Sequence, residues 1–223
     1  MLQTATLQFL KDLEKHNNKP WFDENRNRYE TAKNDFLAFT DTLIDTFGKK
    51  DASIANLTAR ECIFRINRDI RFSKNKTPYK NNLGVSINKG GKKSMLAGYY
   101  FHLQPGNKSF MGGGLWQPMP ADLQKVRQEI DYNFTDFKKL LNSKNFKTIY
   151  GSLSTEEGMA LSRVPKGYDT DNPAAEFLKF KSFVAMTPVS DKQLTDKTLL
   201  KQTVQAFATL QPLLNFLNEA LEA

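Results

Sequence analysis

The stretch LGVSINKGGKKSMLAGYYFHLQPGNKSFMGGGLW, residues 83–116, decides the fold class. Its first part, LGVSIN, places an apolar residue at every second position, which is typical of a strand with one buried face. The turn-forming run NKGGKKS leads into a second strand over residues 94–104, and PGN leads into a third over residues 108–116. Strands that follow one another through short turns predict an antiparallel β-meander.

The strand at residues 94–104 has two distinct faces. Alternation predicts that one face is turned to the core, and it carries Met95, Ala97, Tyr99, Phe101 and Leu103. Tyr100 and His102 lie on the opposite face. A histidine on that face could act as a general acid or base if it faces the basic residues described below, although a lone histidine is more often structural.

Helical periodicity surrounds these strands on both sides in the sequence. Helices are predicted over residues 4–16, from Asn17 or Asn18 to Gly48, over 120–132, over 134–142, and over 191–222 with a break or kink at Pro212. Between residues 143 and 190, TIYGSLS and SFVAMTPVS are possible strands and NPAAEFLKF a helix. We therefore predict one α+β domain over residues 1–223, an antiparallel meander sheet with flanking helices on one side.

Composition excludes several classes of protein. The chain has 223 residues, of which 39% are hydrophobic and 25% charged, as in ordinary globular proteins. No apolar run approaches the roughly 20 residues that span a bilayer, and the N-terminus does not read as a signal peptide. The single Cys62 excludes an internal disulfide framework, and we expect it to be a buried packing residue. We expect a cytoplasmic protein without a membrane partner, a metal or another cofactor.

Positive charge is concentrated in one part of the chain. Residues 60–93 hold ten Lys and Arg against Glu61 and Asp69, while the other residues hold 22 bases and 22 acids. The formal net charge of +8 therefore arises locally. Such a concentration indicates either an anionic partner or a solvated basic rim.

The centre of this segment is FRINRDIRFSKNKTPYKNN, residues 64–82, which we predict to start with a strand over residues 62–72. Strand alternation places Asp69 on one face between Arg65 and Arg71, whose forked guanidinium groups suit phosphate or carboxylate. A solvated, ion-paired face is the alternative. Arg68 falls on the apolar face, where it must either pair with a buried acid or open into a polar cavity.

The loop after this strand adds further phosphate-binding groups. Lys76, Tyr79 and Lys80 follow the arginines closely, but the order of residues is not that of a Walker loop. The run Gly112-Gly113-Gly114 is a candidate for close backbone approach or a nest of amides, and a turn at the end of a strand is the commoner interpretation.

The motifs NNKPWFDENRNRYE (17–30), FRINRDIRFSKNKTPYKNN (64–82), GYYFHLQPG (98–106), GGGLWQP (112–118) and RVPKGYDTDNPAAEFLKFKSF (163–183) together resemble the domain-of-unknown-function family 2461. The matching signature residues are Trp21, Phe22, Asn25, Tyr29, Arg65, Arg68, Asp69, Arg71, Phe72, Lys76, Thr77, Pro78, Tyr79 and Lys80. The resemblance implies one recurring unit and a shared site, and it supplies no reaction. Where this chain has Asp171-Asn172-Pro173 the family often has Asp-His-Pro, so no histidine role is carried over there.

These observations lead to one expected site and three possible functions. The expected ligand contacts are Arg65, Arg68, Arg71, Lys76, Tyr79, Lys80, Trp21, Asn25, Arg28, Tyr100 and Trp116, and the acid-base candidates of an enzyme are His102 and Asp69. The first expectation is binding, with or without turnover, of a small phosphate-bearing or other anionic ligand. The alternatives are a nucleic-acid-binding protein and a protein-interaction module that uses the basic rim.

Overall fold

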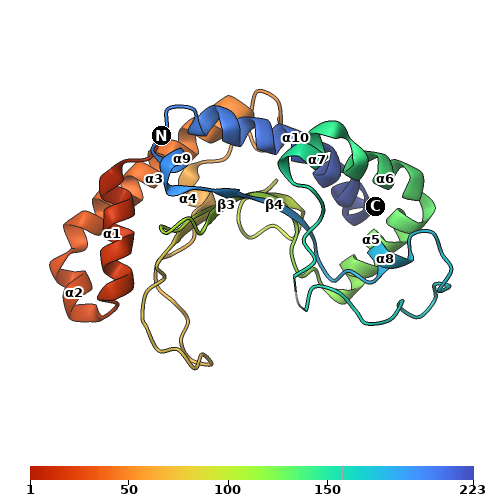
Figure 1. The fold of residues 1–223 in the computed structure, drawn as a ribbon, viewed down its shortest axis with the longest axis horizontal. Coiled ribbons are helices and arrows are strands. Elements are labelled where there is room, and N and C mark those ends of the chain that lie inside the picture. Colours follow the sequence, from red (N-terminus) through yellow and green to blue (C-terminus); the bar gives the residue numbers. More distant parts are fainter. Residues whose placement is uncertain (157) are drawn as a thin grey trace. The chain divides into compact units, whose positions relative to one another are not determined.

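The computed structural model describes residues 1–156 and 158–223, and it confirms the α+β class (Figure 1). In the described part of the chain the sheet has the strand order β1-β2-β3-β4. The strands are β1 (Leu83–Ile87), β2 (Gly98–Leu103), β3 (Ser109–Leu115) and β4 (Phe183–Val189). Neighbours in the sheet are therefore neighbours in sequence, which confirms the predicted antiparallel meander.

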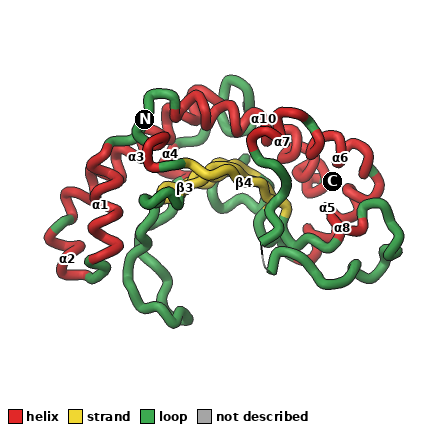
Figure 2. The backbone as a smooth tube through the Cα atoms, in the orientation of Figure 1, coloured by secondary structure: helices red, strands yellow, loops and turns green. Residues whose placement is uncertain are grey.

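Helices precede, separate and follow these strands (Figure 2). They are α1 (Thr4–Lys15), α2 (Lys19–Glu24), α3 (Arg26–Phe47), α4 (Ala59–Cys62), α5 (Pro120–Tyr132), α6 (Phe134–Asn142), α7 (Lys144–Ile149), α8 (Ala175–Leu178), α9 (Asp191–Leu194) and α10 (Leu199–Glu222). None of them, within the described residues, combines the length and the hydrophobicity that crossing a bilayer requires.

The residues group into two compact units. The first unit comprises Met1–Lys93, Tyr100–Met111 and Pro188–Gln205, and the second comprises Ser94–Tyr99, Gly112–Thr187 and Ala206–Ala223. Each unit is described by itself below. The number of independently folding domains stays a prediction.

The core of the first unit is built from α1, α3 and the inward residues of β1 and β2. Helix α3 packs on α1 and on β1, and its Phe36 and Phe39 rings lie 6.2 and 5.3 Å from the ring of Phe101. Phe101 is fully buried, as alternation predicts. Because α3 covers the Phe101 face, the face of β2 that carries Tyr100 and His102 is left for other partners.

The helix predicted from Asn17 or Asn18 to Gly48 is interrupted at Asn25. The Asn18 side chain accepts a hydrogen bond of 3.0 Å from the Trp21 amide and caps α2, as its position before Pro20 predicts. Asn25 has non-helical backbone angles and its side chain donates to the Trp21 carbonyl. A short polar side chain that hydrogen-bonds to nearby backbone, as Asn25 does here, competes with the regular hydrogen bonds of a helix.

The prediction of a strand over residues 62–72 is wrong. Cys62 ends α4, and the residues that follow pair with their partners only at isolated bridges, Ile63 with Val85 and Asn67 with Tyr79. The Arg68 amide donates to the Pro78 carbonyl, but Pro78 has no N–H to return the bond, so a regular ladder cannot continue. Residues 63–82 instead form a narrow two-stranded loop, called the arm from here on, which extends away from α4 (Figure 2).

Several expectations fall in the second unit. Met95 is 58% exposed, so its predicted place in the core is wrong, because β2 begins only at Gly98. TIYGSLS is not a strand: α7 covers its start, and the buried Tyr150 donates from its hydroxyl to the Ala206 carbonyl at 2.7 Å. The second strand candidate, SFVAMTPVS, is β4.

The C-terminal helix is divided before Leu199 rather than at Pro212. Helix α9 is separate, and α10 runs through Pro212. The predicted break at the proline is therefore wrong, and a kink there stays a prediction.

Candidate functional site

The arm is anchored to the helical part of the first unit by Tyr79. The Asn17 side chain donates to the Tyr79 carbonyl at 2.9 Å and accepts from the Tyr79 amide at 3.0 Å. The buried ring of Tyr79 stacks on Phe22 with 3.9 Å between centroids. Tyr79, expected as a ligand contact, therefore lies where it fixes the base of the arm.

Arg68 ties the two sides of the arm together. Its guanidinium donates to the Thr77 carbonyl at 3.2 Å, to the Thr77 hydroxyl and to the Ser73 hydroxyl at 3.3 Å. Within the described residues these partners are uncharged oxygens, so the expectation of a buried acid is wrong. Lys76 also connects the two sides of the arm, because its ammonium donates to the Ile70 carbonyl at 3.0 Å.

Arg71 and Asp69 form a forked ion pair in the outer part of the arm. The Arg71 Nε and Nη2 donate to the two Asp69 oxygens at 3.0 and 2.7 Å. These hydrogen bonds are the main reason why the pKa of Asp69 lies below its usual value, with a smaller contribution from the charge of Arg65. Asp69 thus forms its hydrogen bonds with Arg71 and none with Arg65. The charge of Arg71 is therefore already compensated by this carboxylate.

Arg65 and Lys80 lie close enough at the base of the arm for their charges to interact, and neither forms an ion pair within the described residues. Burial lowers the pKa of the partly buried Lys80, and the positive charge of Arg65 lowers it further. The Lys80 ammonium lies 5.5 Å from the centre of the Phe64 ring. In the described part of the chain, no carboxylate pairs with Arg65 or with Lys80. Two cations that repel each other beside aromatic groups favour the binding of an anion.

Tyr100, His102 and Gln104 follow one another on the face of β2 that α3 leaves uncovered. The Tyr100 hydroxyl lies 3.3 Å from His102 Nδ1, and His102 Nε2 lies 2.9 Å from Gln104 Oε1. Because Gln104 Oε1 can only accept, Nε2 carries the proton and Nδ1 accepts from the Tyr100 hydroxyl. This is the arrangement of a neutral imidazole, whereas a protonated one would donate from Nδ1 to the Tyr100 oxygen instead.

The surroundings of His102 keep it neutral. Burial lowers its pKa, the hydrogen bond to Gln104 opposes that effect, and the charge of Lys80 lowers the pKa further. The Phe110 ring stacks on the imidazole with centroids 4.6 Å apart. Since the Lys80 charge is felt at His102, Lys80 lies near enough to the histidine to influence it.

Glycine 84 makes room for this group. A Cβ atom at Gly84 would lie 2.6 Å from the Tyr100 hydroxyl oxygen, so a larger residue there would push the Tyr100 side chain from its place across β1. We call Arg65, Lys80, Tyr100 and His102 the basic-aromatic cluster, with Phe64, Phe110 and Gln104 as its neighbours.

The stability of the folded protein should depend on the protonation of His102. A folded-state pKa below the ordinary 6.5 means that the unfolded chain takes up the proton first as the pH falls. The stability that neutral His102 contributes is therefore present above pH 6.5 and is lost as the pH falls towards the lower, folded-state pKa. We expect His102→Gln to lose less stability than the wild type between pH 7 and pH 5 in urea unfolding. Parallel pH profiles for the two proteins would contradict this assignment.

The remaining predicted site residues lie elsewhere. Arg28 donates to Asp12 at 2.5 Å and to Asn25 at 3.0 Å, and its guanidinium lies 5.9 Å from the Trp21 ring centre. Trp21, Asn25 and Arg28 are thus joined to one another, with the Arg28 charge compensated. Trp116 belongs to the second unit, directly after β3, and is 57% exposed.

Three residues around the cluster, Gln104, Phe110 and Gly84, were not predicted from the sequence. Gln104 has the same parity as Tyr100 and His102, so strand alternation could have identified it. Phe110 and Gly84 come from the adjacent strands, and the register that brings them to β2 is not visible in any local pattern.

Other kinds of site find less support. No group of His, Cys, Asp or Glu side chains among the described residues could hold a metal ion. Burial raises the pKa of Cys62 to about 11, so its thiol stays protonated at neutral pH.

Comparison with known proteins adds a family. A family model described as "Conserved hypothetical protein (DUF2461)" matches residues 5–216. No curated protein and no solved structure matches the chain.

Proposed function

The chain belongs to the family of conserved hypothetical proteins DUF2461, and the family's description names no reaction. From the side chains alone we propose that the protein binds a small phosphate-bearing or other anionic ligand. The binding groups are Arg65 and Lys80 at the base of the arm. In this proposal the protein is cytoplasmic and residues 64–82 form its ligand site.

One observation carries the proposal, namely that neither Arg65 nor Lys80 forms an ion pair with a carboxylate in the described part of the chain. Lys80 is partly buried, and its pKa is lowered first by that burial and then by Arg65. An ammonium that has lost part of its hydration and meets a second cation is stabilised by an anion placed between the two. Arg71, in contrast, already has a carboxylate and would bind an added anion less well.

Tyr100 and His102 supply the polar groups beside these cations. The Tyr100 hydroxyl donates to His102 in the unliganded arrangement and could rotate to donate to a bound oxyanion instead. An anion close to the imidazole would also raise the pKa of His102 and favour its protonated, donating form. An acid-base role for His102 in turnover depends on such a shift, and the cluster assigns no particular reaction.

The test is a thermal-shift titration with inorganic phosphate, pyrophosphate and a sugar phosphate at constant ionic strength. A ligand at 100 times its dissociation constant stabilises a protein by about 2.7 kcal/mol. For a chain of this length we expect the melting temperature to rise by about 5–10 °C. If every phosphate compound leaves the melting temperature where sodium chloride leaves it, the proposal is wrong.

A further inference from the structure

Phe72 is the most exposed large apolar side chain among the described residues. It is 95% exposed and lies in the outer part of the arm. Single exposed apolar residues are common, but a whole phenyl ring in water within a strongly basic segment is not explained by packing. Neither the fold nor the binding of a small anion uses this ring.

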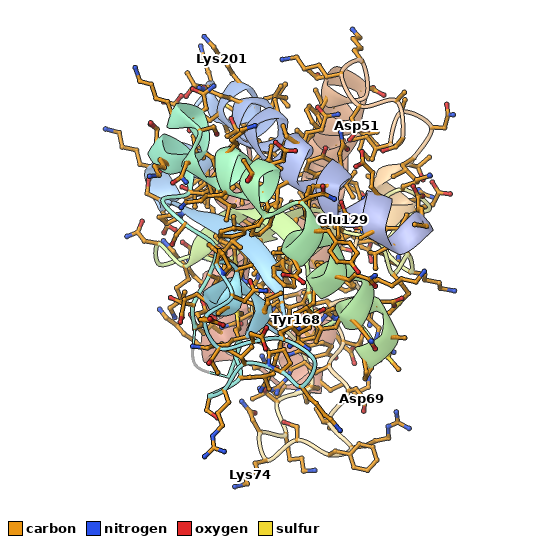
Figure 3. All side chains as sticks on the ribbon, turned by 90° about the vertical axis from the view of Figure 1, so that its right-hand side faces the viewer. Asp51, Asp69, Lys74, Glu129, Tyr168 and Lys201 are labelled. Atoms are coloured by element: carbon orange, nitrogen blue, oxygen red, sulfur yellow. The ribbon has the colours of Figure 1, made fainter. Side chains whose placement is uncertain are left out.

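One cation adjoins this ring, and others are close to it in sequence. The Arg71 guanidinium lies 5.7 Å from its centroid, and Lys74 and Lys76 follow within four residues. Lys74 is exposed at the outer end of the arm, with Asp69 nearer to the rest of the unit (Figure 3). The outer arm thus offers an aromatic face together with positive charge.

The same combination occurs again at the base of the arm. Phe64 is 37% exposed, and Lys80 lies 5.5 Å from its ring centre. Phe64 lies near the start of the arm, whereas Phe72 lies in its outer part. The arm therefore presents two separated places where a ring and a cation adjoin each other.

We propose that the arm binds single-stranded nucleic acid, with a base stacked on Phe72 and phosphates held by Lys74 in the outer part of the arm and by Arg65 and Lys80 at its base. This inference rests on the proposed function, because the phosphate nearest the sheet occupies the Arg65 and Lys80 site. Alternating stacking and phosphate contacts are what a flexible strand needs, since each nucleotide brings one base and one charge.

A duplex and an anionic membrane fit the arm less well. The faces of bases in a duplex are covered by their neighbours, so a free ring has nothing to stack on. A flat anionic membrane attracts only those charges that lie within a Debye length of about 8–10 Å of its surface. The cations of the arm are distributed from its base to its outer end. One phenyl ring is also a weak membrane anchor, because stable attachment takes more buried apolar surface.

Fluorescence anisotropy with labelled oligothymidylate and oligouridylate of about 12 nucleotides tests the proposal, since one small binding fold covers roughly 4–16 nucleotides. Phe72→Ala should weaken oligonucleotide binding about tenfold or more, the usual cost of losing one stacked base. Phe72→Tyr should restore most of the affinity. Pyrophosphate binding should be the same in all three proteins, because Phe72 lies outside the Arg65 and Lys80 site.

The outcomes separate this inference from the proposed function. Pyrophosphate binding without any oligonucleotide binding would overturn the inference and leave the proposed function standing. Equal oligonucleotide affinity in wild type and Phe72→Ala, or stronger binding of the matching duplex, would also overturn it. So would Phe72-dependent sedimentation with phosphatidylserine–phosphatidylcholine vesicles in the absence of oligonucleotide binding. A lack of pyrophosphate binding, by contrast, counts against the proposed function itself.

Discussion

Replacing Arg65 by alanine and Lys80 by methionine in one protein should lower its affinity for pyrophosphate at least about a hundredfold. A hydrogen bond to a charged group contributes about 1.5–3 kcal/mol, so two such contacts amount to about 3–6 kcal/mol. Each 1.4 kcal/mol changes the dissociation constant tenfold. Isothermal titration calorimetry of the wild type and the double variant measures this loss directly.

The double variant should keep the fold of the first unit. Arg65 is exposed, and neither cation makes a hydrogen bond or ion pair within the described residues, so no partner is left unsatisfied. Methionine at position 80 retains an apolar stem that can cover Phe64. Removing two cations that repel each other should leave the melting temperature unchanged or slightly raised.

The matched control is Arg26→Ala with Lys33→Met on α3. It removes the same two charges from the same unit, but both residues are paired with acids nearby, Arg26 with Asp23 and Lys33 with Glu30. We expect nearly unchanged pyrophosphate affinity in this control. An equal loss in both double variants would mean that general charge, and not the basic-aromatic cluster, attracts the anion.

The choice of Lys80 over Arg71 could only be made with the structure. Strand alternation places Arg65 and Arg71 on one face, and the sequence predicted them as ligand contacts together with Lys76 and Lys80, without ranking one above another. The chain from Arg65 to Arg71 is not a regular strand, however, and Asp69 pairs with the nearer arginine. Lys80, which is distant in sequence from Arg65, becomes its neighbour because the arm folds back on itself and its two sides pair near the base, where Asn67 bridges to Tyr79.

Local patterns predicted those parts of the fold that local patterns determine. The helix over 134–142 has the predicted bounds, and the alternation of β2 correctly placed Phe101 in the core. The strand over 62–72 was predicted from the same alternation but does not form, because Pro78 removes the donor that its partner segment would need. Alternation describes the side chains of one segment and carries no information about the hydrogen bonds of its neighbour.

The glycine run shows the same limit in the second unit. Neither a strand-end turn nor a nest of amides is formed, because residues 112–114 lie inside β3. The third possibility, close backbone approach, is the one observed. A Cβ atom on Gly114 would lie 2.0 Å from the Phe183 carbonyl oxygen of β4 and 2.7 Å from Val184 Cα.

Gly114→Ala should therefore be among the most destabilising single substitutions in the second unit. The added methyl group meets backbone on the adjacent strand, which cannot rotate away like a side chain, and the φ angle of 133° is one that alanine rarely adopts. We expect a loss of about 3 kcal/mol or more, and a fall in melting temperature of about 6–12 °C for a chain of this length. Thermal unfolding followed by circular dichroism measures it.

Gly151→Ala is the matched control, because it separates backbone strain from steric contact. Gly151 also belongs to the second unit and has a positive φ angle of 72°, but a Cβ atom there would meet nothing within 4 Å. Its substitution should cost only the strain of the backbone, about 1 kcal/mol. A similar loss in both variants would show that the close approach of β3 and β4 contributes nothing beyond that strain, and that the glycine run is not required for the pairing of these strands.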